Sequence, residues 1–345
     1  MKLKSVALVA ALSLAASFAA CAETVLNVYA PQGVVASIEK YISPIMKSRY
    51  DTRVVITPVL SGQALTKAVA QRASPEISVF MLDEGPWLQG KQAGLWDSLD
   101  GVKNIADIPA RFRDKDSQGS AFLLYLLGII YDEKALAALG VKPPTSYADL
   151  WNPALKGKVT IPDSNSTFSY ALLFKVNDME PGGDHRKSVD AGFKKLSELR
   201  PNIGVFHGGA STLIPLFSQR QAAIGFNASF PAQRLAADGL PIRWVAPKEG
   251  AIAVASYVAV AKNAPARDAA KTFVDLVLSP QYQGLQTEAS YSGFVHPKTQ
   301  LSPAFEKNFV IKPADMQKAT LMDWETFLGK RRELTTRWQR EVEAK

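Results

Sequence analysis

Short apolar, β-branched runs alternate with helical patterns along this chain. The first three runs occupy residues 25–30, 53–60 and 76–82, and the helical patterns that follow them occupy residues 34–49, 63–72 and 87–93. Each run ends in a turn of small or polar residues. Strands and helices that alternate with short turns are typical of a parallel sheet with helices on both faces. A second set of the same kind begins at Lys158. The pattern therefore predicts an α/β protein with two lobes.

Two apolar stretches without helix caps separate the two sets. Residues 121–131 form the first stretch, and residues 253–261 form the second, after a turn at residues 247–250. We expect both stretches to be strands that carry the chain from one lobe to the other. The predicted boundaries are residues 23–120 for the first part of lobe 1, 121–249 for lobe 2, and 250–345 for a return to lobe 1 plus C-terminal helices. The last of these helices is predicted over residues 314–343.

The N-terminus has the features of a signal peptide over residues 1–22. Lys2 and Lys4 precede an uncharged apolar run at residues 6–20, and Ala20-Cys21-Ala22 fits a small-x-small cleavage site. The run is shorter than the roughly 20 residues that a membrane-spanning helix needs. Cleavage there would give a mature chain that starts at Glu23, contains no cysteine and suits the periplasm, an oxidising compartment.

A lipoprotein is the alternative interpretation of the same segment. In that case the chain would be cleaved just before Cys21 and anchored through it. Phe18 stands where a lipoprotein signal usually has Leu, Val or Ile, so the cleaved, unanchored form is favoured.

Composition and charge are those of an ordinary globular protein. The chain has 47% apolar and 21% charged residues, with 40 basic against 32 acidic side chains. The basic excess is spread along the chain, and its densest cluster, Lys330-Arg331-Arg332, has Glu333 beside it. This cluster favours a solvated helix face over a nucleic-acid surface, so no nucleic-acid partner is expected.

Three strand-end turns carry hydroxyl and glycine residues that are candidates for ligand binding. Ligands of open parallel sheets sit beyond the carboxyl ends of the strands, and free N–H groups at helix starts attract anions. For any single turn, an ordinary helix cap is the simpler interpretation. For three turns that face one cleft, we expect at least one to contact the ligand. The candidates in these turns are Ser61, Gly62, Ser164, Ser166, Thr167, Gly209 and Ser211.

Two acids, an aromatic residue and an amide complete the candidates from the residues themselves. Asp83 and Glu84 follow the third strand, where one of them would pair with an ammonium group of the ligand or else remain in solvent or cap a helix. Tyr125 lies in the first crossing strand, and Asn227 ends a strand of the second set.

An enzyme is the competing class. The chain has three histidines, His185, His207 and His296, and none has the spacing of a metal-binding motif. No Gly-x-Ser-x-Gly nucleophile turn and no cysteine cluster occur. Without an assembled catalytic set, neither catalysis, a metal nor a cofactor is expected.

The segment GIIYDEKALAALGVKPPTSYADLWNPALKGKV at residues 128–159 closely resembles the mid-chain signature of the extracellular solute-binding proteins of ABC importers. The turn at residues 247–250 and Tyr291-Ser292-Gly293 follow the same pattern. The nearest branch includes the polyamine and ferric-iron binders. The resemblance implies a two-lobed periplasmic-binding-protein fold of the type II kind, with the ligand cleft between the lobes. It also implies a monomer that delivers a small solute to an inner-membrane ABC permease.

Departures from the family pattern bear on the ligand. Polyamine binders usually place an aromatic residue and an acid, two apart, on the return strand, where this chain has Val254 and Ser256. Ferric binders place paired tyrosines where this chain has Ser229-Phe230. We therefore expect a small polar solute, anionic or zwitterionic, with Ser256 among its contacts. A spermidine or putrescine binder is the alternative, and a periplasmic enzyme is the less favoured one.

Overall fold

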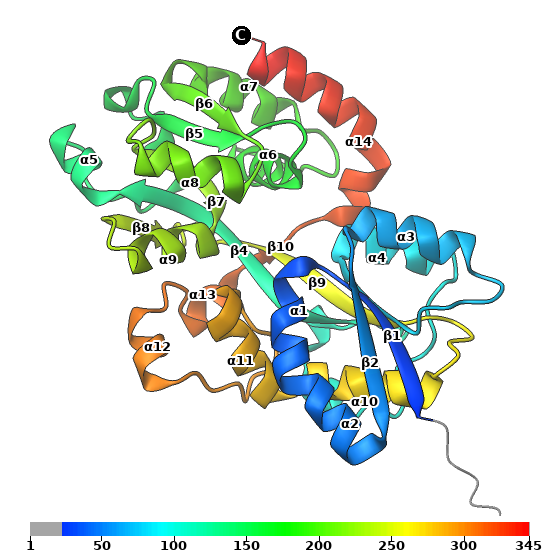
Figure 1. Ribbon diagram of the computed structural model, residues 1–345. Helices are drawn as coiled ribbons and strands as arrows, with labels where there is room; N and C mark the ends of the chain where they lie inside the picture. The colour runs from blue at the N-terminus through cyan, green and yellow to red at the C-terminus, as the bar shows by residue number, and fades with distance from the viewer. Residues whose placement is uncertain (1–22, 345) are drawn as a thin grey trace, which may run out of the picture.

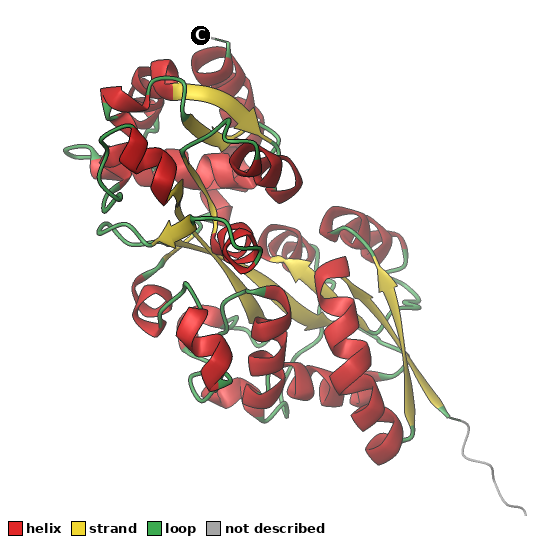
Figure 2. Ribbon diagram, turned by 60° about the vertical axis from the view of Figure 1, so that its left-hand side comes forward, coloured by secondary structure: helices red, strands yellow, loops and turns green. Residues whose placement is uncertain are grey.

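The computed structural model describes residues 23–344 of the chain, so the predicted signal peptide lies outside the described residues. Two lobes are joined by long strands, and helices pack around the strands in both lobes (Figure 1, Figure 2). The strands form one sheet in the order β2-β1-β3-β9-β4-β7-β5-β6, with β10 pairing β9 and β8 pairing β4. This is the α/β architecture that the alternating pattern predicts.

The elements of lobe 1 up to the first crossing are β1 (Thr24–Ala30), α1 (Gln32–Ser37), a π-helical turn (Ile38–Ile42), α2 (Ser43–Tyr50), β2 (Thr52–Pro58), α3 (Ser61–Ala70), β3 (Val79–Asp83), α4 (Glu84–Gln92) and 3-10 turns at Asn104–Asp107 and Ala110–Phe112. The three strands β2, β1 and β3 are parallel. Their carboxyl ends therefore meet at one edge of the sheet, where α1, α3 and α4 begin.

The crossing strands β4 (Ser120–Asp132) and β9 (Ile252–Val260) hold the two lobes together. They pair antiparallel over the first half of β4, and the second half of β4 pairs with β7 and β8 of lobe 2. All nine residues of β9 and eleven of the thirteen in β4 are buried. Burial on both faces explains why these strands are continuous apolar runs without an alternating pattern. The two predicted crossings are confirmed as strands.

The elements of lobe 2 are α5 (Glu133–Ala138), 3-10 turns at Tyr147–Trp151 and Pro153–Leu155, β5 (Val159–Pro162), α6 (Thr167–Met179), α7 (Asp190–Leu199), a 3-10 turn (Arg200–Asn202), β6 (Ile203–His207), α8 (Ala210–Ser218), β7 (Ile224–Ala228), α9 (Ser229–Ala237) and β8 (Ile242–Val245). Polar side chains cap the start of two of these helices. Asp132 accepts the Lys134 and Ala135 N–H groups at the start of α5, and Ser166 accepts the Phe168 N–H at the start of α6.

After β9 the chain forms α10 (Arg267–Val277), α11 (Pro280–Ser290), α12 (Pro303–Asn308), α13 (Pro313–Lys318), β10 (Thr320–Leu321), α14 (Trp324–Trp338) and a final π-helical turn (Gln339–Glu343). The prediction of a single helix over residues 314–343 is wrong. Its backbone is interrupted because Thr320 and Leu321 pair with β9, and the chain resumes a helix only after Asp323, whose side chain accepts the Thr326 N–H.

Helix α14 belongs to lobe 2, although the predicted boundaries group it with the return to lobe 1. It runs beside the lobe 2 elements in Figure 1, where it is drawn in red. Its apolar face, with Phe327, Leu334 and Trp338, is buried in the same core as α6 and α7. Trp324, at its start, packs against Gly85 at the start of α4, where an added Cβ would lie 2.6 Å from the indole ring. The helix thus links both lobes.

A polar network crosses three neighbouring strands of lobe 2, β7, β5 and the edge strand β6. Thr160 of β5 donates its hydroxyl hydrogen to the Val205 carbonyl, at 2.8 Å, so the His207 Nδ1, 2.9 Å from the same oxygen, must be the donor. The Asn227 amide nitrogen lies 2.7 Å from the His207 Nε2 and donates to it. The imidazole is therefore neutral, and it joins β5, β6 and β7 at their carboxyl ends. Burial lowers the pKa of His207 to about 4.

This network predicts a loss of stability in mild acid. The pKa of an unfolded histidine is about 6.5, so below that pH the unfolded chain binds a proton that the folded chain does not. The free energy of unfolding should fall as the pH drops from about 6.5 to about 4, by about 2 kcal/mol already at pH 5. Urea unfolding of the wild type and of His207→Gln at pH 7 and pH 5 tests this. The wild type should lose more stability between the two pH values than the variant, and equal losses would contradict the assignment.

Candidate functional site

Three sequence-predicted residues meet at the carboxyl end of β3. Asp83 ends β3 and is paired directly with Ser256 of β9, while Ser61 begins α3. The Ser61 hydroxyl donates to Asp83 Oδ2 at 3.0 Å, and the Ser256 hydroxyl donates to Asp83 Oδ1 at 3.2 Å. Each carboxylate oxygen thus receives one hydroxyl, which fixes the orientation of the Asp83 side chain.

The Asp83 carboxylate can still accept hydrogen bonds from a cationic group. Its side chain is partly buried, and within residues 23–344 no lysine, arginine or histidine forms an ion pair with it. An ionised carboxylate offers about four acceptor positions, of which the two serines use two. A buried or partly buried charge is stabilised by an opposite charge, so an ammonium group is the natural partner of this carboxylate.

An aromatic pair lies beside this carboxylate and spans the lobes. Tyr125 of β4 and Phe230 of α9 have ring centroids 5.7 Å apart, at an interplanar angle of 56°. Burial, with a smaller contribution from the negative charge of Asp83, raises the pKa of Tyr125 to about 12, so its hydroxyl stays protonated. Phe230 is a residue that the sequence indicated only as a departure from the ferric pattern. Its position at the start of a strand-end helix was the available signal.

The neighbouring acid Glu84 has a different environment. Its side chain is partly buried near Trp324 and Tyr257, and its Oε2 atom is fully buried and has no hydrogen-bond partner among the described residues. Burial raises the pKa of Glu84 to about 8, against the smaller opposing effects of the Trp324 indole and the Ala255 N–H. At neutral pH the group is therefore mostly the uncharged acid. Of the two acids predicted as amine partners, only Asp83 presents a negative charge.

Gly62 extends the Ser61 turn. It is exposed in the first turn of α3, and no side chain among the described residues caps the start of this helix. The first-turn N–H groups of α3 are thus open next to the Ser61–Asp83 contact.

The turn after β5 is engaged within the protein. The Ser164 N–H and hydroxyl both bind the carboxylate of Glu343, at 2.6 Å and 3.1 Å. Ser166 caps α6 through the Phe168 N–H, at 3.3 Å, as the simpler interpretation of this turn expects. Ser164 and Thr167 also line a groove of about 560 Å³ between α6 and α14. The turn does bind an anion, but the one bound in the structure is the chain's own carboxylate.

The other lobe 2 candidates divide into exposed and buried positions. The Gly209 N–H donates to the Thr212 hydroxyl, at 3.2 Å, and Ser211 between them is exposed. Asn227 is buried, with its amide nitrogen on His207 and its carbonyl oxygen accepting the Ala228 N–H at 2.7 Å. Asn227 therefore holds the strand ends in place, and its side-chain groups are already bonded.

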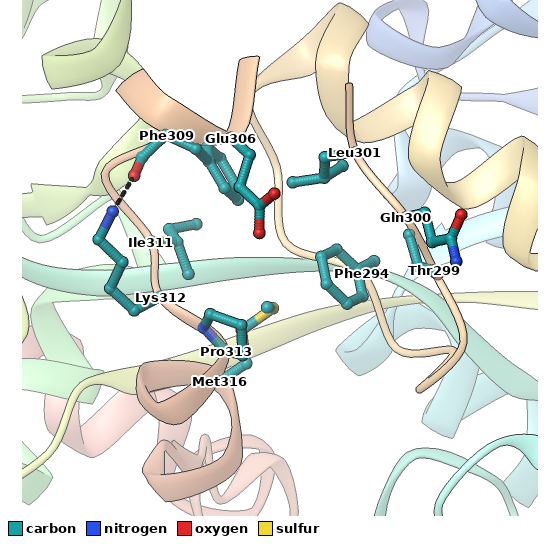
Figure 3. A pocket seen from close by; sticks show the side chains of 10 residues that line it. All are labelled: Phe294, Thr299, Gln300, Leu301, Glu306, Phe309, Ile311, Lys312, Pro313 and Met316. Carbon is teal, nitrogen blue, oxygen red and sulfur yellow. Dashed lines mark hydrogen bonds between the residues drawn. The ribbon is translucent and has the colours of Figure 1, made fainter. Parts of the chain in front are cut away.

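A separate cavity of about 390 Å³ lies in the C-terminal part of lobe 1 (Figure 3). The Glu306 carboxylate points into it, among apolar side chains such as Phe294 and Met316, and the Lys312 ammonium donates to the Phe309 carbonyl at 3.0 Å. None of the sequence-predicted site residues lines this cavity.

Residues 23–344 contain neither a cluster suited to a metal ion nor a helix suited to spanning a membrane. In that part of the chain, no cluster of three or more His, Cys, Asp and Glu side chains has the arrangement to bind a metal ion. None of the helices described there combines the length and the apolar character that crossing a bilayer requires.

Comparisons with known proteins identify the family. The family model for bacterial extracellular solute-binding proteins matches residues 81–318. The γ-aminobutyric acid-binding protein of Pseudomonas aeruginosa is 25% identical over 320 residues, which cover 88% of this chain and 86% of that protein. The spermidine/putrescine-binding periplasmic protein of Escherichia coli is 29% identical over 147 residues, 41% of this chain and 40% of that protein.

Solved structures support the same fold. An ABC transporter protein from Clostridium perfringens has a TM-score of 0.81 at 24% identity, over 92% of this chain and 99% of that one. The predicted family and two-lobed fold are thus confirmed, and the family is one of solute-binding proteins and not of enzymes. The chain belongs to the bacterial extracellular solute-binding proteins and has the periplasmic binding protein fold.

Proposed function

We propose that the solute is a small zwitterion whose ammonium group binds Asp83 between the two lobes. The observation that carries this proposal is the Asp83 carboxylate, oriented by Ser61 and Ser256 and lacking a cationic partner among the described residues. Tyr125 and Phe230, one on a crossing strand and the other in lobe 2, would pack against the carbon chain of the solute. Closure of the lobes would then bury the ammonium–carboxylate pair.

The named relatives support an ammonium-bearing solute. γ-Aminobutyric acid and the polyamines share a primary ammonium group, and proteins that bind them are among the relatives of this chain. The γ-aminobutyric acid binder aligns over most of its length, whereas the E. coli polyamine binder aligns over 40%. A zwitterion of this kind agrees with the expectation from the sequence, in which open helix starts receive an anionic group.

The departures on β9 argue against a polyamine. Val254 is buried and apolar, and Ser256 bonds to Asp83, so neither can hold a second amine. Glu84 is mostly uncharged at neutral pH. A polyamine would need a further carboxylate from lobe 2, and Asp163, just after β5, is a carboxylate at a strand end of that lobe.

Delivery to a permease completes the proposed function. We infer that the protein works as a monomer in the periplasm, and that the closed, loaded form is the one an inner-membrane ABC permease recognises. The anionic end of the solute would be met by hydroxyls and N–H groups of the turns at Gly62, Thr167 and Ser211, which remain candidates.

Replacement of Asp83 by Asn should weaken binding of γ-aminobutyrate at least 10-fold, because a charge-assisted hydrogen bond contributes about 1.5–3 kcal/mol. Calorimetry on the wild type and the variant measures this. Asp163→Asn is the matched control, since it removes one strand-end carboxylate from lobe 2, and it should leave the affinity within about 2-fold. A thermal-shift screen finds the best ligand first, because a solute at 100 times its dissociation constant adds about 2.7 kcal/mol of stability.

The same two variants discriminate against the polyamine alternative. Spermidine should bind more weakly than γ-aminobutyrate to the wild type. If spermidine binds more tightly, and loses affinity in both Asp83→Asn and Asp163→Asn, the zwitterion proposal is wrong and the polyamine alternative replaces it.

Export should produce a mature protein that begins at Glu23. The reason is the basic and then apolar start with the Ala20-Cys21-Ala22 site, and the measurement is mass spectrometry of protein recovered from the periplasm. A diacylated Cys21 at the N-terminus would instead establish the lipoprotein form.

Solute binding should need no metal. We expect protein treated with a chelator to bind the solute found in the thermal-shift screen with unchanged affinity, because the proposed contacts are a carboxylate, hydroxyls and aromatic rings. Metal analysis and calorimetry before and after treatment check this. A stoichiometric, tightly held metal, or chemical turnover of the bound solute, would contradict it.

A further inference from the structure

The groove between α6 and α14 has an unusual set of side chains. It has a volume of about 560 Å³, within the range of small-molecule sites. Two of the lining residues are arginines, none is acidic, and most of the others carry a hydroxyl or an amide. The lining residues are Ser164, Asn165, Thr167, Tyr170, Phe327, Leu328, Gly329, Arg331, Arg332, Thr335 and Thr336.

The two arginines differ from the other cations of the C-terminal segment. Arg337 pairs with Asp190 and Glu341, and Arg340 pairs with Glu341. Within residues 23–344, by contrast, the guanidinium groups of Arg331 and Arg332 have no ion-pair or hydrogen-bond partner; Arg331 only lies 5.9 Å from the centre of the Phe327 ring. Both are exposed along the groove. They are therefore available to an anion from outside the chain.

The acids near the groove are already bonded. The Glu343 carboxylate accepts the Ser164 N–H and hydroxyl, and Asp163 Oδ1 accepts the Asn165 N–H at 2.9 Å. Neither acid pairs with Arg331 or Arg332. The guanidinium N–H groups of Arg331 and Arg332 are thus not used by these acids, although the predicted interpretation of this basic cluster is a solvated helix face.

Hydrogen bonds of the buried Tyr170 also fix the shape of the groove. The Tyr170 ring is buried, and its hydroxyl lies 2.7 Å from the Ser164 carbonyl and 2.9 Å from the Thr335 hydroxyl. These contacts join the wall formed by the β5–α6 turn to the wall formed by α14. The spacing of the two walls is therefore set before any ligand binds, which reduces the entropic cost of binding.

We propose that this groove binds an anionic group, a phosphate or a carboxylate, through Arg331 and Arg332. A planar guanidinium donates two parallel hydrogen bonds to such a group. The groove lies at the carboxyl edge of the lobe 2 strands, where ligands of α/β sheets bind. The anion is either a free one or the anionic end of the solute held at Asp83, and in the second form the inference rests on the proposed function.

The test uses calorimetry with inorganic phosphate and with γ-aminobutyrate as probes. The variant is the double replacement Arg331→Gln and Arg332→Gln. Its matched control is Lys330→Gln with Arg340→Gln, which removes the same charge from the same segment without changing the groove. Asp83→Asn is included to separate the two sources of the anion. Thermal unfolding of each protein without a probe shows that all are folded.

For a free anion, phosphate should bind the wild type and Asp83→Asn equally, and lose at least 10-fold in affinity in the groove variant but not in the control. If the anion is instead the anionic end of the solute, phosphate should not bind. The affinity for γ-aminobutyrate should then fall at least 10-fold in the groove variant but not in its control. Phosphate binding lost in the groove variant, with γ-aminobutyrate unaffected by Asp83→Asn, supports the groove and refutes the proposed function. The inference is overturned if neither probe is weakened by the groove variant more than by the control, or if neither binds the wild type.

Discussion

The antiparallel pairing of β4 and β9 joins the two lobes and sets the geometry of the site. Both strands pass between the lobes, and nearly all their side chains are buried, so the sheet is continuous across the junction. The same pairing assembles the site. It sets Ser256 opposite Asp83 on one side of β9 and Val254 opposite Tyr125 on the other. Residues far apart in the chain thus share one edge of the sheet.

Burial gives two adjacent acids different chemistry at this edge. Asp83 and Glu84 are neighbours in the sequence, but the strand ends at the first and the helix begins at the second. Asp83 receives two hydroxyls and has no cationic partner in the described chain, whereas Glu84 turns into the junction with α14 and its pKa rises to about 8. The site therefore holds one oriented carboxylate without a cationic partner in the described chain, and a second, uncharged acid lies at the junction.

The fold could be predicted further than the site. Periodicity marks the strand–helix alternation and both crossing strands, because burial on two faces leaves an uninterrupted apolar run. Periodicity does not predict the break in the helix at residues 319–323. Thr320 and Leu321 pair with β9 through backbone groups, which every sequence has. For the site, the pattern places Ser61 and Asp83 at strand ends. It cannot show that Ser164 is hydrogen-bonded to Glu343, that Asn227 bonds to His207, or that Arg331 and Arg332 lack acidic partners. These features depend on contacts between residues that are far apart in the sequence.

A crystal structure of the protein with γ-aminobutyrate would show directly whether Asp83 binds the ammonium group. We expect closed lobes, with the ammonium nitrogen about 3 Å from a carboxylate oxygen of Asp83 and the carbon chain between Tyr125 and Phe230. Ser61 and Ser256 should keep their contacts with the same carboxylate. A solute bound elsewhere, with Asp83 still in contact only with the two serines, would show that Asp83 does not bind the ammonium group.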